Sequence, residues 1–143
     1  MREKIQNDII VGEIKERNFK ISIEEKWDCE LKKLAIVYGF DFAIIKGGEL
    51  KGFVELKKRE FKTTQFNDSM INLNKWINGK ELRDSTGLPT ILICRYIDKD
   101  IYCNLKETTK RKLKWGARTS KTRDWQDIQP AVNIDINEFK DLV

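Results

Sequence analysis

The sequence contains no histidine, and this absence excludes several classes of chemistry. Without an imidazole group the chain cannot form a Ser-His-Asp or Cys-His hydrolase site, a histidine-ligated zinc centre, or a nuclease site in which histidine is the general base. Any hydrolytic chemistry must therefore depend on carboxylates, on lysines and on a hard metal ion.

Cysteines and long apolar runs are also scarce. The three cysteines, Cys29, Cys94 and Cys103, are far apart and form no CxxC pair, which argues against a disulfide framework or a structural zinc site. No apolar run approaches the roughly 20 residues of a membrane span, and the first residues lack the apolar core of a signal peptide. We expect reduced thiols, no membrane association and a cytoplasmic protein.

The length and the charge narrow the class further. With 143 residues, 40% hydrophobic and 36% charged, the chain is expected to form a single domain, residues 1–143. The net charge is +5, and residues 106–123 alone carry eight Lys or Arg against one acid. The basic excess therefore lies in one C-terminal segment, 106–125, which favours contact with a phosphate backbone. The alternative is a loop whose charges only face solvent.

Apolar spacing predicts two helical regions. Residues 3–27 are expected to form one amphipathic helix, or two with a break at Gly12 or Asn18. Residues 66–82 are expected to form a second helix, capped by Thr64 or Gln65; the alternative for these two residues is contact with a phosphate. The large aromatic residues expected in the core are Trp27, Phe53, Phe66 and Trp76.

Turn residues place the strands between these helices. Two apolar runs around Gly47-Gly48 predict a hairpin. We expect strands at 29–34, 40–46, 50–57, 90–96 and 101–105, followed by an irregular basic tail. The predicted fold class is α/β, with a central mixed β-sheet flanked by helices.

The first hairpin carries the residues with the clearest chemistry. Glu55 and Lys57 lie two apart on one strand, so their side chains point to the same face, whereas Leu56 points to the other. Counting outward from the turn at 47–48 places Asp41 near Glu55 on the facing strand. Two carboxylates and one ammonium group then converge on one side of the sheet.

This group suits a hard divalent cation. The carboxylates of Asp41 and Glu55, with the backbone carbonyl of Leu56 as a further ligand, match the oxygen preference of Mg²⁺ or Mn²⁺. Lys57 can orient, or help to deprotonate, the water that attacks phosphorus. The alternative is a solvated hairpin face, because Glu and Lys are common on exposed strands. Apolar neighbours favour a covered rim, where clustered acids need a compensating cation.

The D-x13-E-x-K pattern on a hairpin resembles the PD-(D/E)XK nuclease superfamily, with Phe40-Asp41 in place of the proline-aspartate of its name. The order of helix, hairpin, helix and further strands is that of its core. More narrowly, the chain is similar to small phage-encoded nucleases of this superfamily. The segments that carry the similarity are Tyr38–Asp41, Gly52–Arg59, Lys75-Trp76, Thr86–Pro89, Gly116–Arg118, Arg123-Asp124 and Asp127–Pro130.

The resemblance implies a restriction-endonuclease-like core and divalent-metal-dependent cleavage of phosphodiester bonds. It also implies that a glutamate from the first helix joins the catalytic group; Glu16 fits best by its place on the apolar stripe, and Glu13 is second. A phage-encoded protein would act in the host cytoplasm. Some relatives resolve Holliday junctions or act in recombination.

Cationic and aromatic residues provide the candidate DNA contacts. We expect Arg59 to return to the active face and to bind a phosphate, whereas Lys75 either reaches the active site or is solvated. Trp115 and Trp125 either stack on unpaired bases or fill the core. The predicted contacts of the basic segment are Lys110, Arg111, Lys112, Lys114, Arg118 and Arg123.

The sequence therefore predicts a Mg²⁺-dependent DNA endonuclease that acts in phage recombination, repair or degradation. We expect selectivity for DNA structure or shape, because the sequence holds no separate base-reading unit. A chain of this size rarely spans a duplex alone, which favours a homodimer, and no organic cofactor is expected. Two alternatives are a non-catalytic nucleic-acid-binding protein that keeps the nuclease fold, and a protein-interaction module that binds no nucleic acid.

Overall fold

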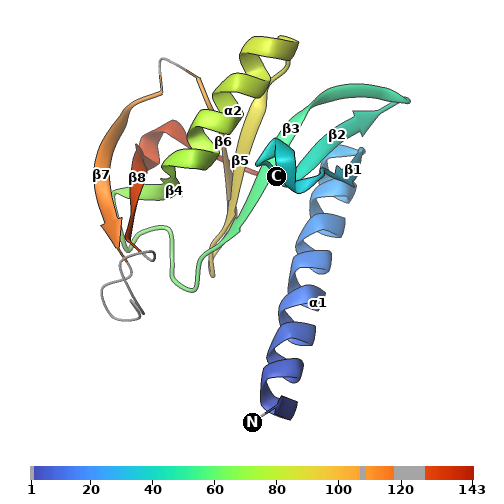
Figure 1. The fold of residues 1–143 in the computed structure, drawn as a ribbon, viewed down its shortest axis with the longest axis vertical. Helices are drawn as coiled ribbons and strands as arrows, with labels where there is room; N and C mark the ends of the chain where they lie inside the picture. The colour runs from blue at the N-terminus through green and yellow to red at the C-terminus, as the bar shows by residue number, and fades with distance from the viewer. Residues whose placement is uncertain (1, 107–108, 118–127) are drawn as a thin grey trace.

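The computed structural model describes residues 2–106, 109–117 and 128–143. This part of the chain forms two helices and two sheets (Figure 1). In chain order the elements are α1 (Arg2–Trp27), β1 (Glu30–Lys33), the 3-10 turn η1 (Ile36–Tyr38), β2 (Phe42–Lys46), β3 (Glu49–Lys58), β4 (Asp68–Asn72), α2 (Leu73–Thr86), β5 (Thr90–Arg95), β6 (Asp100–Asn104), β7 (Arg111–Ala117), β8 (Ile128–Asp135), the 3-10 turn η3 (Ile136–Glu138) and β9 (Lys140–Asp141).

The larger sheet is mixed and has the strand order β1-β2-β3-β5-β6-β9. Neighbouring strands pair antiparallel except β3 and β5, which run parallel from Phe53↔Thr90 to Lys58↔Arg95. A parallel pair needs a crossover connection, and β4 with α2 supplies it. This arrangement confirms the expected α/β class with a central mixed sheet, and it is compatible with a restriction-endonuclease-like core.

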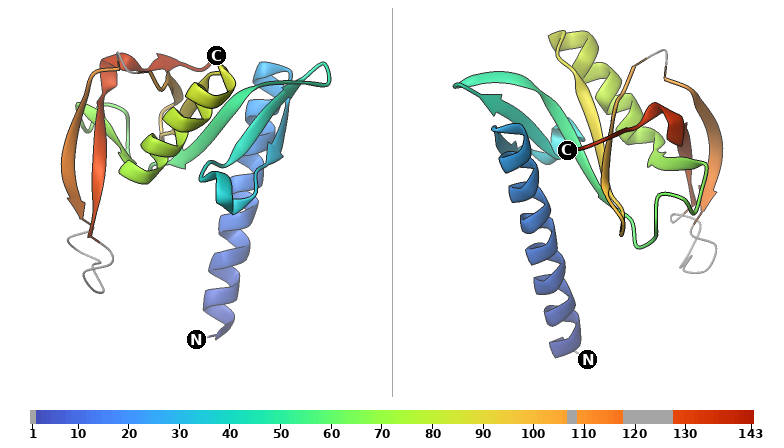
Figure 2. Two further views of the ribbon diagram at one scale, coloured as in Figure 1. Left: turned by 45° about the horizontal axis from the view of Figure 1, so that its top comes forward. Right: turned by 180° about the vertical axis from the view of Figure 1, so that it is seen from behind.

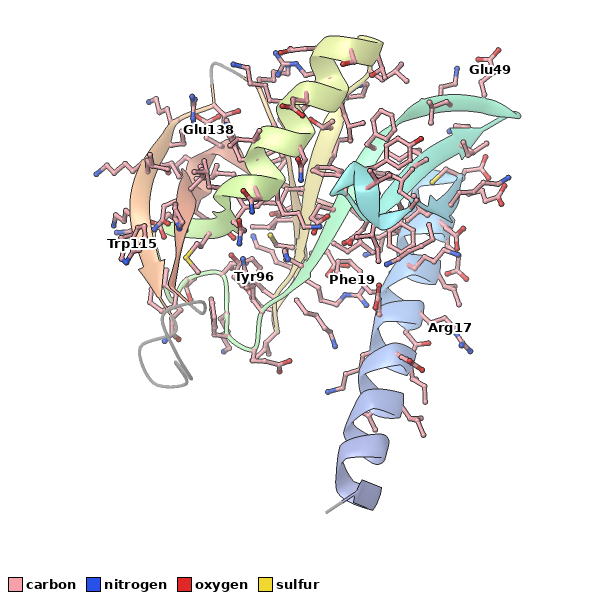
Figure 3. All side chains as sticks on the ribbon, in the orientation of Figure 1. Arg17, Phe19, Glu49, Tyr96, Trp115 and Glu138 are labelled. Carbon is pink, nitrogen blue, oxygen red and sulfur yellow. The ribbon has the colours of Figure 1, made fainter. Side chains whose placement is uncertain are left out.

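One face of the larger sheet is covered by the C-terminal half of α1. Phe19 and Ile23, one helical turn apart, are both buried against the sheet. Side chains from β1, β2, β3 and β5 complete this cluster: Leu31, Phe42, Ile44, Val54 and Ile93. In Figure 3, Phe19 points toward the sheet and Arg17 points away from it.

The N-terminal half of α1 projects away from both sheets (Figures 1 and 2). The helix is continuous, so neither Gly12 nor Asn18 interrupts it. All the side chains of residues 10–18 are exposed. Among residues 10–27, the part of α1 whose side chains are described, the first buried side chain is Phe19, and it packs with Ile23 against the sheet.

The opposite face of the sheet is covered by α2, which buries Trp76 against it. The Asn72 side chain caps the helix by accepting a hydrogen bond of 2.9 Å from the Asn74 backbone N–H. The expectation that Thr64 or Gln65 caps the helix is therefore wrong. The helix ends at Gly87, whose φ of 71° is the left-handed conformation that glycine adopts without strain.

The helix expected at 66–82 is wrong over its first part, because residues 68–72 form β4. Met70 is 46% exposed and its neighbour Ile71 is 1% exposed, as is typical of successive residues on the two faces of a strand. The sequence also predicts that Phe66 lies in the core. Phe66 is instead half exposed, and its ring contacts the edge of Phe61 at 5.0 Å between centroids.

The basic segment is not an irregular tail, since most of its described residues pair in the smaller sheet, β4-β8-β7. β7 pairs with β8 from Arg111↔Ile134 to Ala117↔Ile128. Proline normally disfavours a central strand, but the β4–β8 ladder ends at Asn72↔Ala131. Pro130 lies just beyond that ladder, so β4 does not require the N–H that proline lacks.

The cysteines are free, as expected, and Cys94 and Cys103 are buried. Burial raises the pKa of the Cys103 thiol to about 12, so this thiol stays protonated at neutral pH. Within the described part of the chain, no helix is both long and apolar enough to cross a membrane.

We predict that Ile23→Ala lowers the free energy of unfolding by about 2–4 kcal/mol, because it removes a fully buried side chain that anchors α1. Ile14→Ala, which changes an exposed isoleucine of the same helix, is the matched control and should shift stability by less than about 0.5 kcal/mol. Urea denaturation followed by circular dichroism measures both. Equal losses in the two variants would contradict the role of the buried Ile23 side chain as an anchor of α1.

Candidate active site

Asp41 and Glu55 lie side by side at the open end of the β2–β3 hairpin. The ladder ends at the Phe42↔Val54 pair, and Asp41 and Glu55 occupy the next position on each strand. The Asp41 backbone N–H donates to Glu55 Oε2 at 3.1 Å. The Leu56 backbone N–H donates to Asp41 Oδ2 at 3.0 Å. The two carboxylates are therefore held together by reciprocal contacts with backbone groups.

Glu55 is a buried acid, only 1% exposed. Its Oε1 lies 3.6 Å from Lys57 Nζ and 3.2 Å from Lys75 Nζ. Burial raises the pKa of the Glu55 carboxyl, and the Asp41 carboxylate raises it further, whereas the two ammonium groups lower it. The site thus combines two nearby carboxylates with two lysines where the β2–β3 ladder ends within a covered sheet.

Strand alternation and helix position explain how these groups meet. Along β3, Val54 packs in the α1 cluster and Phe53 in the α2 cluster. Glu55 and Lys57 continue the face of Phe53, which lies under α2. Lys75 is in the first turn of α2, and its side chain extends from this helix to Glu55 on β3. The Lys75 side chain thus contacts the Glu55 carboxylate, and its role in binding nucleic acid stays a prediction.

A cavity of about 390 Å³ opens beside this group. Its lining comes from α1, the β2–β3 hairpin and α2: Gly12, Glu16, Phe19, Asp41, Glu55, Leu56, Lys57, Lys58 and Lys75. Lys58 lines this cavity with Lys57, although strict alternation predicts that it faces away. Glu16 lies at the rim and forms an ion pair of 3.5 Å with Lys33. Glu13 is not among the lining residues.

The oxygen atoms at the cavity fit a hard divalent cation. Among the described residues, no group of three or more acidic or cysteine side chains is placed to hold a metal. Asp41 and Glu55 nevertheless present two carboxylates to one cavity. The N–H and C=O of a strand residue point to the same side, so the Leu56 carbonyl faces the side on which its N–H meets Asp41. Mg²⁺ commonly binds one or two carboxylates and keeps several waters.

Arg59 lies outside the cavity lining. Its guanidinium donates to the Met70 carbonyl, and its backbone N–H donates to the Arg95 carbonyl at 2.8 Å. β3 ends at Lys58, so alternation along the strand does not extend to Arg59. The structure ties this side chain to β4 rather than bringing it to the carboxylates, and its contact with phosphate stays a prediction.

Of the predicted DNA contacts of the basic segment, Lys110 directly precedes β7, and Arg111, Lys112 and Lys114 lie on it. Lys110, Lys112 and Lys114 are exposed, and alternation along β7 puts Lys112 and Lys114 on one face. Arg111 stacks on the Trp76 ring, with 4.6 Å from Cζ to the ring centroid. Trp115 is 71% exposed and lies at the outer edge of the smaller sheet (Figure 3), so it does not fill the core. Arg118, Arg123 and Trp125 lie outside the described residues.

Sequence reasoning missed the role of Asn78 in α2. Its Nδ2 donates to the Gly39 carbonyl at 3.3 Å. Gly39 has a φ of 64°, and a Cβ there would lie 1.9 Å from Asn78 Nδ2, so both conformation and space require glycine. This contact fixes the turn that leads into Asp41. Gly39 itself signals a special backbone conformation, but no sequence pattern connects it with Asn78.

Residues 11–142 match the family model described as "Phage putative PDDEXK endonuclease". The chain belongs to this family. The match confirms the resemblance to phage nucleases of the PD-(D/E)XK superfamily, and it covers the cavity, α2 and both sheets. No curated protein and no solved structure matches the chain.

We predict that Lys75→Met destabilises the protein. The substitution leaves the buried Glu55 carboxylate without the nearer of its two ammonium partners. The free energy of unfolding at pH 7 in EDTA should fall by about 1–3 kcal/mol, measured by urea denaturation.

The matched control is Lys58→Met, which changes an exposed lysine of the same cavity. Its effect should stay within about 0.5 kcal/mol. A loss of equal size in both variants would show that Lys75 does not act as the counter-ion of Glu55.

Proposed function

We propose that this family member is a metal-dependent DNA endonuclease whose site is formed by Asp41, Glu55 and Lys57 within one nuclease domain. The observation that carries the proposal is the reciprocal contact of Asp41 with Glu55 and Leu56 beside two lysines. A buried carboxylate next to a second one is costly for folding unless a cation compensates it. The PD-(D/E)XK family match supports the same function.

Asp41, Glu55 and the Leu56 carbonyl would hold Mg²⁺ or Mn²⁺, and Glu16 is the candidate for a further acidic group at the rim. When bound, such an ion supplies a Lewis acid that offsets negative charge developing on the phosphate. The two backbone-to-carboxylate hydrogen bonds hold the acids in place before any ligand arrives. Because the carboxylates are already in position, no free energy is needed to reorganise them during the reaction.

The two lysines have separate roles in the proposal. Lys57 Nζ lies at the cavity, 3.6 Å from Glu55 Oε1, where it can orient the attacking water or exchange a proton with it. Lys75 Nζ is nearer to the same oxygen, at 3.2 Å, and balances the buried charge. Both ammonium groups also attract the phosphate that must approach two carboxylates.

The DNA backbone is proposed to extend from this cavity to the basic face of β7. Lys112 and Lys114 lie at alternate positions of β7, about 6.8 Å apart. Lys110 directly precedes the strand, and all three lysines are exposed. Trp115 offers an exposed ring on the other face of the same strand. Phosphate contacts and stacking of this kind carry little base sequence information. They support selectivity for DNA structure or shape. The biological role that we propose for this activity is phage recombination, repair or degradation.

We predict that Asp41→Asn and Lys57→Ala each reduce DNA cleavage at least about 100-fold, because each removes a group that acts on the reacting atoms. EDTA should abolish cleavage by the parent protein. DNA binding by Asp41→Asn should be unchanged or tighter, since a negative charge near phosphate is lost. The assay is cleavage of labelled duplex, four-way junction, flap, single strand and RNA with Mg²⁺ or Mn²⁺.

The control for these variants is Glu49→Gln, which removes an exposed carboxylate at the hairpin tip and should cut like the parent. Salt-sensitive binding without cleavage in either metal would instead indicate a non-catalytic nucleic-acid-binding protein. Cleavage by Asp41→Asn at the parental rate would refute the assignment of the site.

The β7 contacts have their own test. Replacing Lys112 and Lys114 together by glutamine should reduce the slope of log K against log salt by about 1.8, because each phosphate contact contributes about 0.9. The control pair is Lys51→Gln with Lys140→Gln, two exposed lysines of the larger sheet. This pair changes the net charge equally. Equal slopes for both double variants would place the DNA elsewhere than on β7.

A further inference from the structure

The η1 turn exposes three successive large apolar side chains. Ile36 is 97% exposed, Val37 87% and Tyr38 50%. Single exposed apolar residues are common, but a contiguous group outside the core usually marks a contact surface. Neither the metal site nor the core of the protein uses these residues.

The backbone of this turn is fixed rather than loose. The N–H groups of Tyr38 and Gly39 donate to the carbonyls of Ala35 and Ile36 at 3.0 and 2.9 Å. Asn78 of α2 donates to the Gly39 carbonyl and so holds the end of the turn. The side chains of Ile36 and Val37 are therefore held in solvent by an ordered backbone, instead of collapsing onto the sheet.

The turn lies beside the candidate active site. Tyr38 precedes Asp41 by three residues, so their Cα atoms are at most about 11 Å apart. The Leu34 N–H donates to the Asp41 carbonyl at 2.9 Å and closes the base of this loop. On α2, Lys75 reaches Glu55, and Asn78, three residues later and on the same helix face, reaches Gly39. One face of α2 thus supports both the carboxylates and the turn.

The surroundings indicate what the apolar group contacts. Lys57, Lys58 and Lys75 line the neighbouring cavity, and ammonium groups suit the phosphates of a nucleic acid. Bases offer the apolar, stacked faces between which aliphatic wedges insert. On its α2 side the turn borders a recess of about 200 Å³, lined by Val37, Tyr38, Asn78, Glu81, Leu82 and Ser85. Polar groups of this recess could meet the edge of a displaced base.

We propose that the Ile36–Tyr38 turn is a wedge that enters the base stack of the DNA held at Asp41 and Glu55. A protein with such a wedge prefers DNA whose bases unstack easily, at a mismatch, a bulge or a branch point, to a fully paired duplex. Unstacking costs least where pairing is already broken. This inference rests on the proposed nuclease function and names the substrate class of that site.

The test combines a double variant, Ile36→Ser with Val37→Ser, with two duplexes that differ only in one internal mismatch. Both side chains are nearly fully exposed, so the variant should fold like the parent. The parent should cut the mismatched duplex at least about tenfold faster, and the variant should lose most of this preference. In EDTA, 2-aminopurine beside the mismatch should gain fluorescence with the parent and not with the variant.

Leu50→Ser is the matched control, because it removes an exposed apolar side chain from the tip of the β2–β3 hairpin. It should behave like the parent in both assays. A parent that cuts both duplexes equally and leaves 2-aminopurine quenched would overturn the wedge while the nuclease stands. A parent that neither binds nor cuts DNA would overturn the proposed function itself. A variant that changes only the sedimenting mass would make the turn a protein interface and overturn the wedge.

Discussion

Two hydrogen bonds across the open end of the β2–β3 hairpin decide where the candidate site lies. The β2–β3 ladder stops at Phe42↔Val54. Beyond it, backbone N–H groups donate to side-chain carboxylates instead of to strand carbonyls: Asp41 N–H donates to Glu55, and Leu56 N–H donates to Asp41. Buried backbone donors need partners, and here carboxylates take the place of the missing strand residues. The same contacts that end the ladder therefore hold two acids side by side, so strand termination and site geometry are one feature.

The arrangement has a cost that the rest of the site offsets. A buried carboxylate beside another is unfavourable, which is why the pKa of Glu55 is raised by burial and by Asp41. Lys75 and Lys57 reduce that cost from two directions, one from α2 and one from β3. The parallel β3–β5 pair requires the crossover through α2. The same helix carries Lys75, the nearer of the two ammonium groups that balance the Glu55 carboxylate. Sites of this kind trade stability of the free protein for affinity toward a cation and a phosphate.

The acidic pair could be placed from sequence because its positions follow from strand periodicity. Counting outward from Gly47-Gly48 places Glu55 one residue further from the turn than Asp41. The structure accommodates this extra residue where the β2–β3 register shifts between Ile44 and Ile45. Lys75 could not be assigned, because its reach depends on how β4 and α2 cross the sheet. β4, β7 and β8 were missed for a related reason: strands with few large apolar residues, polar in β4 and basic in β7, are defined by their neighbours more than by their own sequence.

The change from exposed to buried side chains along α1 has a consequence for Glu16. Isolated helices shorter than about 12–15 residues are marginal in water, and residues 10–18 have exposed side chains throughout. Glu16 lies one turn before the buried Phe19, at the border between the exposed residues 10–18 and the buried residues that follow. Its carboxylate is therefore subject to the helix–coil equilibrium of residues 10–18. Amide exchange over 10–18 thus reports how often the rim of the cavity loses its acidic group.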